Sequence, residues 1–554
     1  MPVITVNKDY FCKLVGKDLS MSFIEERLPM LGVGWEEKTK SEFSVEVFPN
    51  RPDMLSVEGL ARAFASFIRI RPGLKEYKAL DSEYLVTVDS KVSKVRPYFV
   101  AAVVKNVRFT DELIKSIIQL QEKLHMTHGR KRRKVAIGLH DLDKVFFPVT
   151  YTTKPPDFSF IPLEQNREMT LKQILEKLPK GKEYAWILEG KEEYPILIDD
   201  KGVVLSMPPI INSEATKVEE GTKNLFIDVT ATDLKAANEV LNILVTTFAD
   251  IGCEIYKVKV KYVDTLITTP NLQPRSVELD PEYVNKLLGL DLSVEKIIEL
   301  LEIMGYSAVK IDNKIEVKVP CYRCDIMHSI DLVEDIAIAY GYENFEPTIP
   351  NIATLGKENE FEEFSNKFRN FLVGFGLQEV TTFMLTNREK LFKKMNMPHV
   401  EVAETLNPKT EEYCVVRNWL LPSLMEILAK NKRYEYPQNL FEVGDVVHLD
   451  EKGETGVKME RRLAIVLCHA KASFSEIKSV AESILLNLGI KDYKIEEGKC
   501  PCFIEGRDAL IKVKGEIIGR FGEIHPLVLE NWSLEMPVAA LEMNVSFLFK
   551  LIRS

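Results

Sequence analysis

The spacing of apolar and polar positions changes several times along the chain, which predicts several α+β domains rather than one repeated motif. From about residue 95 to 262, strand-like and helical segments alternate. From about 268 to 346 the pattern predicts two short helices, strands around IEVKVP and a final helix. Beyond about residue 352 it predicts a large antiparallel sheet with flanking helices.

A chain of 554 residues is long enough for three or four domains. We predict four: an N-terminal α/β domain at 1–88, a mixed domain at 89–264, a domain with helix-turn-helix and wing layout at 268–346, and an antiparallel-sheet domain at 350–554. The two short helices and the segment before them carry only Lys286, Lys296 and Arg275 as basic residues, so we expect this domain to contact protein rather than read DNA.

The composition is that of an ordinary globular protein. Charged residues make up 28% and hydrophobic residues 45% of the chain, as in ordinary globular proteins. The net charge of −10 argues against a surface covered with nucleic-acid contacts. We find no signal-peptide pattern and no apolar run near the ~20 residues that span a membrane, so we expect a cytoplasmic protein without a membrane partner.

The eight cysteines do not suggest a disulfide framework in a chain of this length. Cys321 and Cys324 form a C-x-x-C pair, and Cys500 and Cys502 form a C-x-C pair. A four-thiolate zinc site from the two pairs is disfavoured, because the pairs lie far apart in the sequence and neither lies in a glycine-rich knuckle.

An acidic helix before Gly341 is the densest cluster of candidate ligands. We predict about ten helical residues from Asp331, with Asp331 or Ser329 as N-cap and Gly341 as the C-terminal stop. Asp331, Glu334 and Asp335 then share one face, which Asp325 in the preceding loop can reach. A solvated acidic helix start is the simpler interpretation. Carboxylates at this spacing also suit Mg²⁺.

The opposite side of this helix carries an apolar stripe, which we expect to face the core. Its members are Val333, Ile336, Ala337 and Tyr340. Ile338 is expected among the carboxylates on the outer face, and an apolar residue there suggests a surface covered by a partner.

A run of five basic residues, Arg130, Lys131, Arg132, Arg133 and Lys134, directly precedes the strand-like segment VAIGL. Such a run is often only a solvated loop. In an acidic chain it is also a candidate for phosphate contacts with salt-dependent binding.

Polar side chains gather at the ends of three predicted strands. Asp199 to Gly202 forms a turn, Pro208-Pro209 ends the following strand, and Ile227 and Val229 face away from Asp228 and Thr230. Ser206, Asn212, Asp228 and Thr230 therefore lie where pockets are often built, although turn chemistry explains them equally well. Without a G-x-S-x-G elbow or a histidine in this segment, a serine-hydrolase mechanism is disfavoured.

Several motifs in order resemble one family. They are R-x-D-I-x-x-x-x-D-L-x-E-D followed by I-A-Y-G-Y, the segments SMPPIINSE and FIDVT, and further along GFGLQEV, FEVGDV and GEIHP. Together they are similar to the β subunit of phenylalanyl-tRNA synthetase of the archaeal and eukaryotic type, across essentially the whole chain.

The resemblance implies a ligase of (αβ)₂ composition that charges tRNA-Phe with phenylalanine. The α subunit would hold the synthetic site and its substrate ATP, and a Mg²⁺ site shared with it would fall on Asp325, Asp331, Glu334 and Asp335. The last domain resembles a class II synthetase fold without its catalytic groups. Arg417 is followed by Asn418 and Trp419 rather than by the Arg-x-Glu of motif 2, and GRFGEIHP lacks the motif 3 pattern.

The resemblance also implies editing, the hydrolysis of tyrosine wrongly attached to tRNA-Phe, in the domain at 89–264. A pocket made for phenylalanine cannot strongly reject an isostere that adds only a hydroxyl, so a second site is needed. By position, Leu197 would form the pocket wall, with Ser206, Asn212, Asp228 and Thr230 as its polar groups. We expect these to position water and the ester, because no base accompanies Ser206.

Two alternatives remain from the sequence. The first is a free-standing tRNA-binding or editing protein without a synthetic partner. The second is a Mg²⁺-dependent nuclease centred on Asp331 to Asp335, which is disfavoured because no run of basic residues accompanies those acids.

Overall fold

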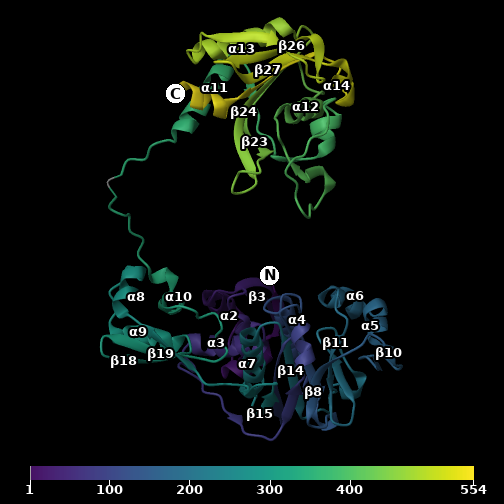
Figure 1. Cartoon of the computed structure of the whole chain (residues 1–554). Helices are drawn as coiled ribbons and strands as arrows, with labels where there is room; N and C mark the ends of the chain where they lie inside the picture. The colour runs from purple at the N-terminus through teal and green to yellow at the C-terminus, as the bar shows by residue number, and fades with distance from the viewer. Residues whose placement is uncertain (1, 353, 554) are drawn as a thin grey trace. The chain divides into compact units, whose positions relative to one another are not determined.

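The computed structural model describes residues 2–352 and 354–553, which form two compact units that meet in the chain at Ile349 and Pro350 (Figure 1). The expected domains 1–88 and 350–554 thus include positions 1, 353 and 554, which lie outside the described residues. Nowhere in the described part is a helix both long and apolar enough to cross a membrane.

The chain begins with a small antiparallel sheet of order β1-β3-β2 and helices packed on it. The elements are β1 (Val3–Asn7), α1 (Lys8–Val15), α2 (Met21–Arg27), β2 (Gly34–Lys38), β3 (Glu42–Glu46) and α3 (Val57–Phe67). Ser56 caps α3 by accepting a hydrogen bond from the amide of Gly59.

A larger sheet follows, with the order β13-β12-β11-β8-β5-β15-β6-β14-β7, and β4 and β16 pairing with β15. Its strands are β4 (Ala79–Leu80), β5 (Leu85–Val88), β6 (Tyr98–Lys105), β7 (Val135–Asp141), β8 (Val149–Lys154), β11 (Tyr194–Ile198), β12 (Val204–Met207), β13 (Ile211–Asn212), β14 (Leu225–Ala231), β15 (Glu254–Lys261) and β16 (Leu266–Thr269). Since β4 and β5 precede residue 88, the sheet begins inside the expected N-terminal domain.

Helices α4 (Asp111–Met126) and α7 (Leu234–Asp250) pack on this sheet, and the side chain of Asp233 caps α7. A smaller subdomain before β11 contains β9 (Ser159–Phe160), β10 (Met169–Thr170), α5 (Leu171–Lys177) and α6 (Pro179–Tyr184).

The sheet curls so that its two end regions touch. The amide of Asn212, on β13, donates a hydrogen bond of 3.2 Å to the carbonyl of Leu139, on β7, although these strands lie at opposite ends of the strand order. His140 on β7 likewise contacts Thr216, just beyond β13, at 2.8 Å. The curl therefore brings β12 and β13 next to β7 and β14.

The next region contains the predicted two helices, strands and final helix, preceded by a strand that was not predicted. The elements are β17 (Arg275–Leu279), α8 (Pro281–Leu288), α9 (Val294–Ile303), β18 (Ser307–Ile311), β19 (Lys314–Val319) and α10 (Ser329–Tyr340). Its strands form a sheet of order β17-β19-β18. Gly289 and Gly341, which follow α8 and α10, have φ angles of 69° and 92°, in the region that favours glycine.

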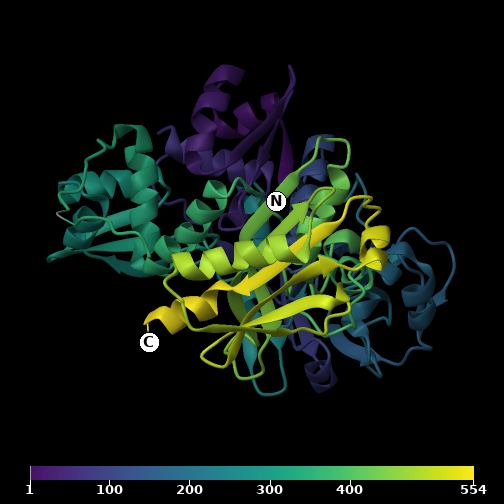
Figure 2. The same cartoon turned by 90° about the horizontal axis from the view of Figure 1, so that it is seen from above.

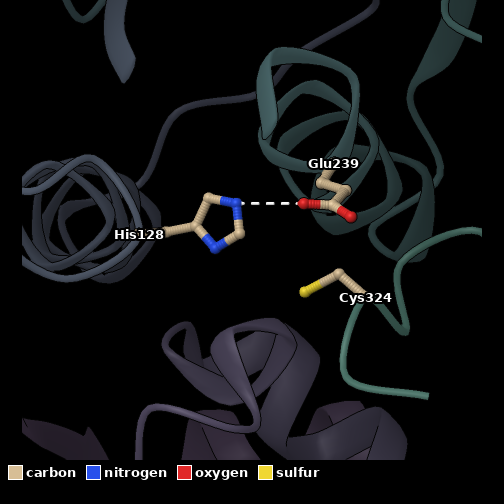
Figure 3. Close-up of side chains that lie close together, drawn as sticks. All are labelled: His128, Glu239 and Cys324. Atoms are coloured by element: carbon tan, nitrogen blue, oxygen red, sulfur yellow. Dashed lines mark ion pairs between the residues drawn. The ribbon is translucent and has the colours of Figure 1, made fainter. Parts of the chain in front are cut away.

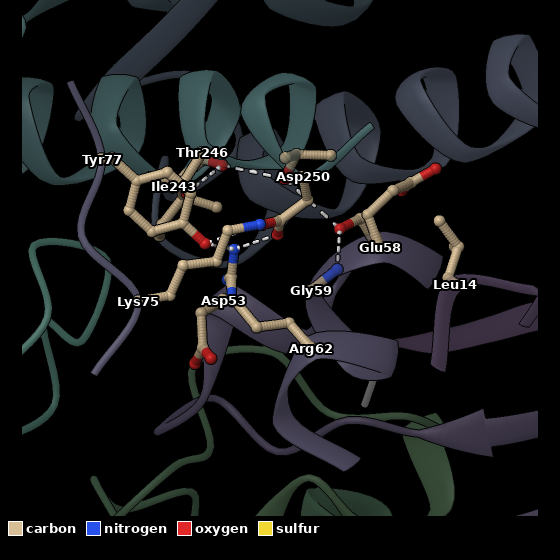
Figure 4. A network of polar contacts seen from close by, with 12 residues as sticks. Leu14, Asp53, Glu58, Gly59, Arg62, Lys75, Tyr77, Ile243, Thr246 and Asp250 are labelled. Carbon is tan, nitrogen blue, oxygen red and sulfur yellow. Dashed lines mark hydrogen bonds and ion pairs between the residues drawn. The ribbon is translucent and has the colours of Figure 1, made fainter. Parts of the chain in front are cut away.

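These three regions share one hydrophobic core, which runs from Ile4 to Ile336. A polar network also joins the first two of them (Figure 4): Asp250, at the end of α7, accepts hydrogen bonds from Arg62 on α3 at 2.6 Å, from Lys75 at 2.7 Å and from Tyr77 at 2.7 Å. Because core and network are continuous, their division at residues 88 and 264 remains a prediction.

The second unit is built on the predicted large sheet, of order β20-β23-β24-β28-β27-β26-β25, antiparallel except for the β20–β23 pair. The strands are β20 (Gln378–Glu379), β23 (Gln438–Leu449), β24 (Val457–Cys468), β25 (Tyr493–Glu497), β26 (Phe503–Val513), β27 (Glu516–Ile524) and β28 (Val538–Asn544), with the short pair β21 (Leu385–Thr386) and β22 (Val415–Val416) beside it.

Helices cover both faces of this sheet (Figures 1 and 2). On one face lie α11 (Glu360–Gly374), α13 (Phe474–Asn487) and α15 (Val545–Arg553), and on the other α12 (Leu421–Lys430) and α14 (Pro526–Asn531). Alternate side chains of β24 enter the two cores, Ile465 on the first face and Val466 on the second.

Candidate active site

A cavity of about 110 Å³ lies where the two end regions of the curled sheet meet. Its lining combines β7, β12, β13 and β14 with the end of α4 and the loop after it. The polar lining residues are Gln121, Glu122, His125, Arg132, Lys180, Ser206, Asn212, Asp228 and Thr230. Four of the five predicted editing residues therefore line one cavity, and the fifth, Leu197, does not.

Strand register explains this grouping. Ser206 on β12 pairs with Asn212 on β13, so the two lie side by side. Asp228 and Thr230 lie two residues apart on β14, which puts them on the same face. Every residue of β14 is buried, because the strand runs between β6 and β7. The carboxylate and the hydroxyl are therefore held on a rigid central strand.

Asp228 is oriented by a histidine that our sequence reasoning missed. Its Oδ1 atom lies 2.8 Å from Nε2 of His140, whose Nδ1 lies 2.8 Å from the hydroxyl of Thr216. His140 is fully buried. The imidazole of His140 therefore binds Oδ1 of Asp228, while Asp228 also lines the cavity.

Gly138 makes that contact sterically feasible. It lies opposite Asp228 in the β7–β14 register, and a Cβ atom there would be 2.1 Å from Oδ1 of Asp228 and 2.9 Å from Nε2 of His140. A glycine inside a strand-like segment often marks such a close approach. The glycine within the strand-like segment VAIGLH is the sequence feature that indicates this close approach.

Thr230 is held by a buried arginine. Arg96 donates to the hydroxyl oxygen of Thr230 at 2.9 Å, to its carbonyl at 2.6 Å and to the carbonyl of Arg133 at 2.9 Å. Burial lowers the pKa of Arg96 to about 10, which leaves it charged at neutral pH. Because the Thr230 oxygen accepts from Arg96, its proton is free to point toward another acceptor.

Three polar atoms around the cavity are buried without a hydrogen-bond partner among the residues described. They are Oγ of Ser206, Nδ1 of His125 and Nε of Arg132. His125 accepts from the amide of Ile137 through Nε2 at 2.9 Å, and burial lowers its pKa to about 4. The neutral ring therefore carries its proton on Nδ1, so all three atoms are donors that a bound molecule could satisfy.

Leu197 does not form the pocket wall as expected. It pairs with Ser206 across β11 and β12, but its side chain is fully buried in a separate apolar cluster with Phe99, Tyr151 and Leu205. Ile210, Ile211 and the Pro208–Pro209 segment supply the apolar wall instead.

The basic run divides into two kinds of residue. Arg132 is buried, stacks on the ring of Tyr184 and donates to the carbonyl of Ile210 at 3.0 Å, so it supports the cavity and does not face solvent. Arg130, Lys131 and Arg133 are exposed, and Lys134 pairs with Asp233 at 3.3 Å. Only part of the run is thus available for phosphate contacts.

The acidic helix differs from the expectation at its start. The N-cap is His328 rather than Asp331 or Ser329, and Asp331 is the third helical residue, whose carboxylate accepts from the amides of Met327 and His328 at 2.7 Å each. This capping box satisfies amides that the helix leaves unpaired. Ile338 packs against the core instead of standing outside it.

Asp335 also departs from the prediction, because it faces inward. It is 5% exposed, accepts from the hydroxyl of Tyr306 and is 2.7 Å from the guanidinium of Arg323, which also binds both carboxylate oxygens of Asp325. A buried cation therefore already neutralises two of the four predicted Mg²⁺ ligands. Among the residues described, these acids do not converge on a common donor set, and only Glu334 is exposed. A Mg²⁺ site on these four acids therefore stays a prediction, and in this arrangement Asp325 and Asp335 are both paired with Arg323.

Three family models match the chain in order. They are the B3/4 domain at residues 80–243, the tRNA synthetase B5 domain at 277–342 and the phenylalanyl tRNA synthetase beta chain CLM domain at 345–545. The cavity described above lies within the first match, and α10 within the second.

Curated relatives match over nearly the full length. The chain is 45% identical to the phenylalanine–tRNA ligase beta subunit of Archaeoglobus fulgidus, over 99% of each chain. It is 44% identical to that of Pyrococcus furiosus, over 99% of this chain and 100% of the relative. The crystal structure of an N-terminal fragment of the phenylalanyl-tRNA synthetase beta-subunit from Pyrococcus horikoshii matches with a TM-score of 0.60 and 41% identity, over 61% of this chain and 99% of the fragment.

Proposed function

The chain belongs to the family of phenylalanine–tRNA ligase β subunits, and from this premise we propose that its cavity hydrolyses tyrosine wrongly attached to tRNA-Phe. The observation that carries the proposal is the cavity itself, in which Ser206, Asn212, Asp228 and Thr230 line one recess with three buried donors left unpaired. Synthesis of phenylalanyl-tRNA is assigned to a partner α subunit.

The unpaired donors explain how such a site selects tyrosine over phenylalanine. A tyrosine side chain brings a hydroxyl that can pair with buried polar groups. Phenylalanine would displace the solvent from these groups and leave them unpaired, at a cost of about 1–3 kcal/mol for each group. A site of this kind therefore rejects the apolar side chain through its polar groups rather than through size.

Hydrolysis is proposed to use water rather than a covalent intermediate. Ser206 makes no hydrogen bond to a base in the described structure, so nothing there activates its hydroxyl as a nucleophile. Asp228, held by His140, can accept a proton from water, and Thr230, held by Arg96, can direct its hydroxyl toward the ester. Ser206 would donate to an ester or carbonyl oxygen.

The second unit is proposed as the structural partner of α in an (αβ)₂ assembly. Arg417, whose neighbours depart from motif 2, is buried, lies 2.8 Å from Glu442 and donates to Thr382 at 2.6 Å. A guanidinium occupied in this way is not free to bind a nucleotide. We therefore place ATP and its Mg²⁺ at the α subunit, and no step of the proposed hydrolysis involves a metal ion.

The test measures two activities of the full chain, with and without a co-expressed α subunit. We expect phenylalanylation of tRNA-Phe only with α. The Asp228→Ala variant should lose at least about tenfold in Tyr-tRNA hydrolysis, and a variant of the exposed Asp157, Asp157→Ala, should not. Full-rate hydrolysis by Asp228→Ala would show that the site is misplaced. A monomer that hydrolyses Tyr-tRNA and binds no α subunit would favour the free-standing editing protein instead.

A further inference from the structure

A histidine, a carboxylate and a thiol from three separate segments converge outside the cavity (Figure 3). His128 lies just beyond the end of α4, Glu239 lies on α7, and Cys324 lies in the loop before α10. One ligand atom from each residue lies within 4.8 Å of the others, and Nε2 of His128 is 3.1 Å from a carboxylate oxygen of Glu239. All three side chains are half-buried.

An ordinary ion pair does not account for the whole cluster. Although Nε2 of His128 lies close to Glu239, it is buried and makes no hydrogen bond among the described residues, so the ring is not aligned for one. An ion pair would also leave the approach of the Cys324 thiol unexplained. Both observations fit a ring nitrogen that serves as a metal ligand, in which case it carries a lone pair and no proton.

The donor types and spacing suit a tetrahedral divalent ion. Zinc binds imidazole nitrogen, carboxylate oxygen and thiolate sulfur at about 2.0–2.3 Å, so its ligand atoms lie roughly 3.3–3.8 Å apart. Mixed nitrogen, oxygen and sulfur ligands favour Zn²⁺ and its neighbours over Mg²⁺ or Ca²⁺. The 3.1 Å separation and the 4.8 Å limit bracket that spacing.

We propose that His128, Glu239 and Cys324 bind one divalent ion of the zinc class, with the fourth position left for water. On binding, the thiol of Cys324 gives its proton to solvent as the sulfur–metal bond forms, while the imidazole binds as the neutral ring. This site is separate from the acidic positions predicted from the sequence, and it does not depend on the proposed hydrolysis.

The position of the ion suggests what it would do. His128 follows His125 by one helical turn and precedes the loop that carries Arg132, so both cavity residues lie on the segment that the ion would anchor. Glu239 would connect the ion to α7, and Cys324 would connect the ion to the loop that leads into α10. The ion would therefore cross-link the cavity region and the acidic helix, which are distant in sequence.

Cobalt is the probe, because Co²⁺ replaces Zn²⁺ and a cobalt–thiolate bond gives a charge-transfer absorption band. The full-length chain is stripped with a chelator and titrated with Co²⁺. We expect one ion per chain, a thiolate band, and displacement of that band by Zn²⁺. The Cys324→Ser and His128→Asn variants should bind at least about tenfold more weakly, with the band absent in the serine variant.

The matched control is Cys321→Ser, which removes the other thiol of the same C-x-x-C pair and should keep the band. Circular dichroism of the stripped variants shows that each is folded, and Zn²⁺ should raise the melting temperature of the wild type but not of Cys324→Ser. No band in the folded wild type would overturn the proposal. A band that persists in both Cys324→Ser and His128→Asn would also overturn it, because it would belong to another pair such as Cys500 and Cys502, whose sulfurs lie 3.0 Å apart.

Discussion

Gly138 is the residue on which the position of the Asp228 carboxylate depends. A methyl group at Gly138 would overlap Oδ1 of Asp228, which must then move away from His140. Since a displacement of about 1 Å at a reacting group can cost about 100-fold in rate, Gly138→Ala should lower Tyr-tRNA hydrolysis by about 10- to 100-fold. Phenylalanylation with α should be unchanged.

The control for this substitution is Gly221→Ala, in the same region. Nothing lies within 4 Å of the Cβ position at Gly221, so that variant should hydrolyse Tyr-tRNA at the wild-type rate. Equal rates for the two alanine variants would argue that Asp228 has no role in the reaction.

Ser206 should show opposite effects on stability and activity. Its buried hydroxyl has no hydrogen-bond partner in the described part of the chain, which costs about 1–3 kcal/mol in the absence of a ligand. Ser206→Ala should therefore leave the free energy of unfolding unchanged or raise it by about 1 kcal/mol, while Tyr-tRNA hydrolysis falls. Urea unfolding and a deacylation assay measure the two effects.

Ser213 provides the comparison for Ser206, because it is equally buried but its hydroxyl donates to the carbonyl of Ile161 and accepts from the amide of Ala215. Ser213→Ala should lower the free energy of unfolding by about 1 kcal/mol. If Ser206→Ala destabilised the protein as much as Ser213→Ala, the Ser206 hydroxyl would have a partner after all.

His125 should make stability depend on pH. Its pKa falls from 6.5 to about 4 on folding because burial disfavours the charged ring, so the unfolded chain binds the extra proton first as pH falls. The folded state is thus fully favoured above pH 6.5 and loses stability progressively down to pH 4. From pH 7 to pH 5 this loss should be about 2 kcal/mol.

Urea unfolding of the wild type and of His125→Gln at both pH values tests this. Glu122 and Arg132 face the same ring and remain in the variant, so the substitution removes only the imidazole from this group of charges. The difference between the two proteins should shrink by about 2 kcal/mol at pH 5. An unchanged difference would mean that His125 is not held neutral by burial.

At the scale of elements, the short loop between α4 and β7 contains both a buried residue that supports the cavity and exposed basic residues that are available for phosphate contacts. Arg130, Lys131 and Arg132 have consecutive positive φ angles of 49°, 54° and 65°, a backbone state that L-residues seldom adopt. In this conformation the side chain of Arg132 points toward the protein interior, while Arg130 and Lys131 remain exposed to solvent. Strain of this kind is often kept at functional sites.

The exposed part of this loop should govern the salt dependence of tRNA binding. Replacing Arg130, Lys131 and Arg133 by glutamine should reduce the slope of log affinity against log salt concentration by up to about 2, because each phosphate contact to a single strand contributes about 0.7. Binding measured at several salt concentrations gives the slope. Lys115→Gln, on the exposed part of α4, is the control. An unchanged slope in the triple variant would remove the loop from the RNA-binding surface.

The helix α10 shows what local spacing can and cannot predict. The stop at Gly341 and the buried stripe of Val333, Ile336 and Ala337 follow from the 3.6-residue period and are confirmed. The same period put Asp335 outside, but Arg323 and Tyr306 bind it inside. A charged residue can therefore face the core when it is paired there, because the cation and the hydroxyl offset the cost of removing the carboxylate from water.

For the whole molecule, the exposed Glu334 is the acid on α10 that remains available to a partner. We therefore expect Glu334→Ala to weaken assembly with α, or its dependence on Mg²⁺, because the variant removes a charge without disturbing the capping role of Asp331. Co-purification of the two subunits and the metal content of the complex are the measurements. Glu343→Ala, another exposed acid just beyond the helix, should behave as wild type. Unchanged assembly and metal content in Glu334→Ala would exclude this role.

The sequence by itself determined the elements, their order and the family. Alternating and 3.6-residue patterns predicted β14, the turn before β12 and the sheet of the second unit, because these depend on neighbours within a few residues. Four of the five proposed editing residues line one cavity, since strand ends and register place them together, while their role in editing stays a prediction.

Only the tertiary structure decided which residues surround that cavity and which carboxylates are free. His140, Gly138, Arg96 and His125 enter the site because the sheet curls and joins its two ends, and Leu197 is absent from the lining because its side chain packs in a separate apolar cluster. Contacts between residues this far apart in the chain depend on how the whole sheet closes and which charges become buried. No local pattern of polar and apolar residues contains that information.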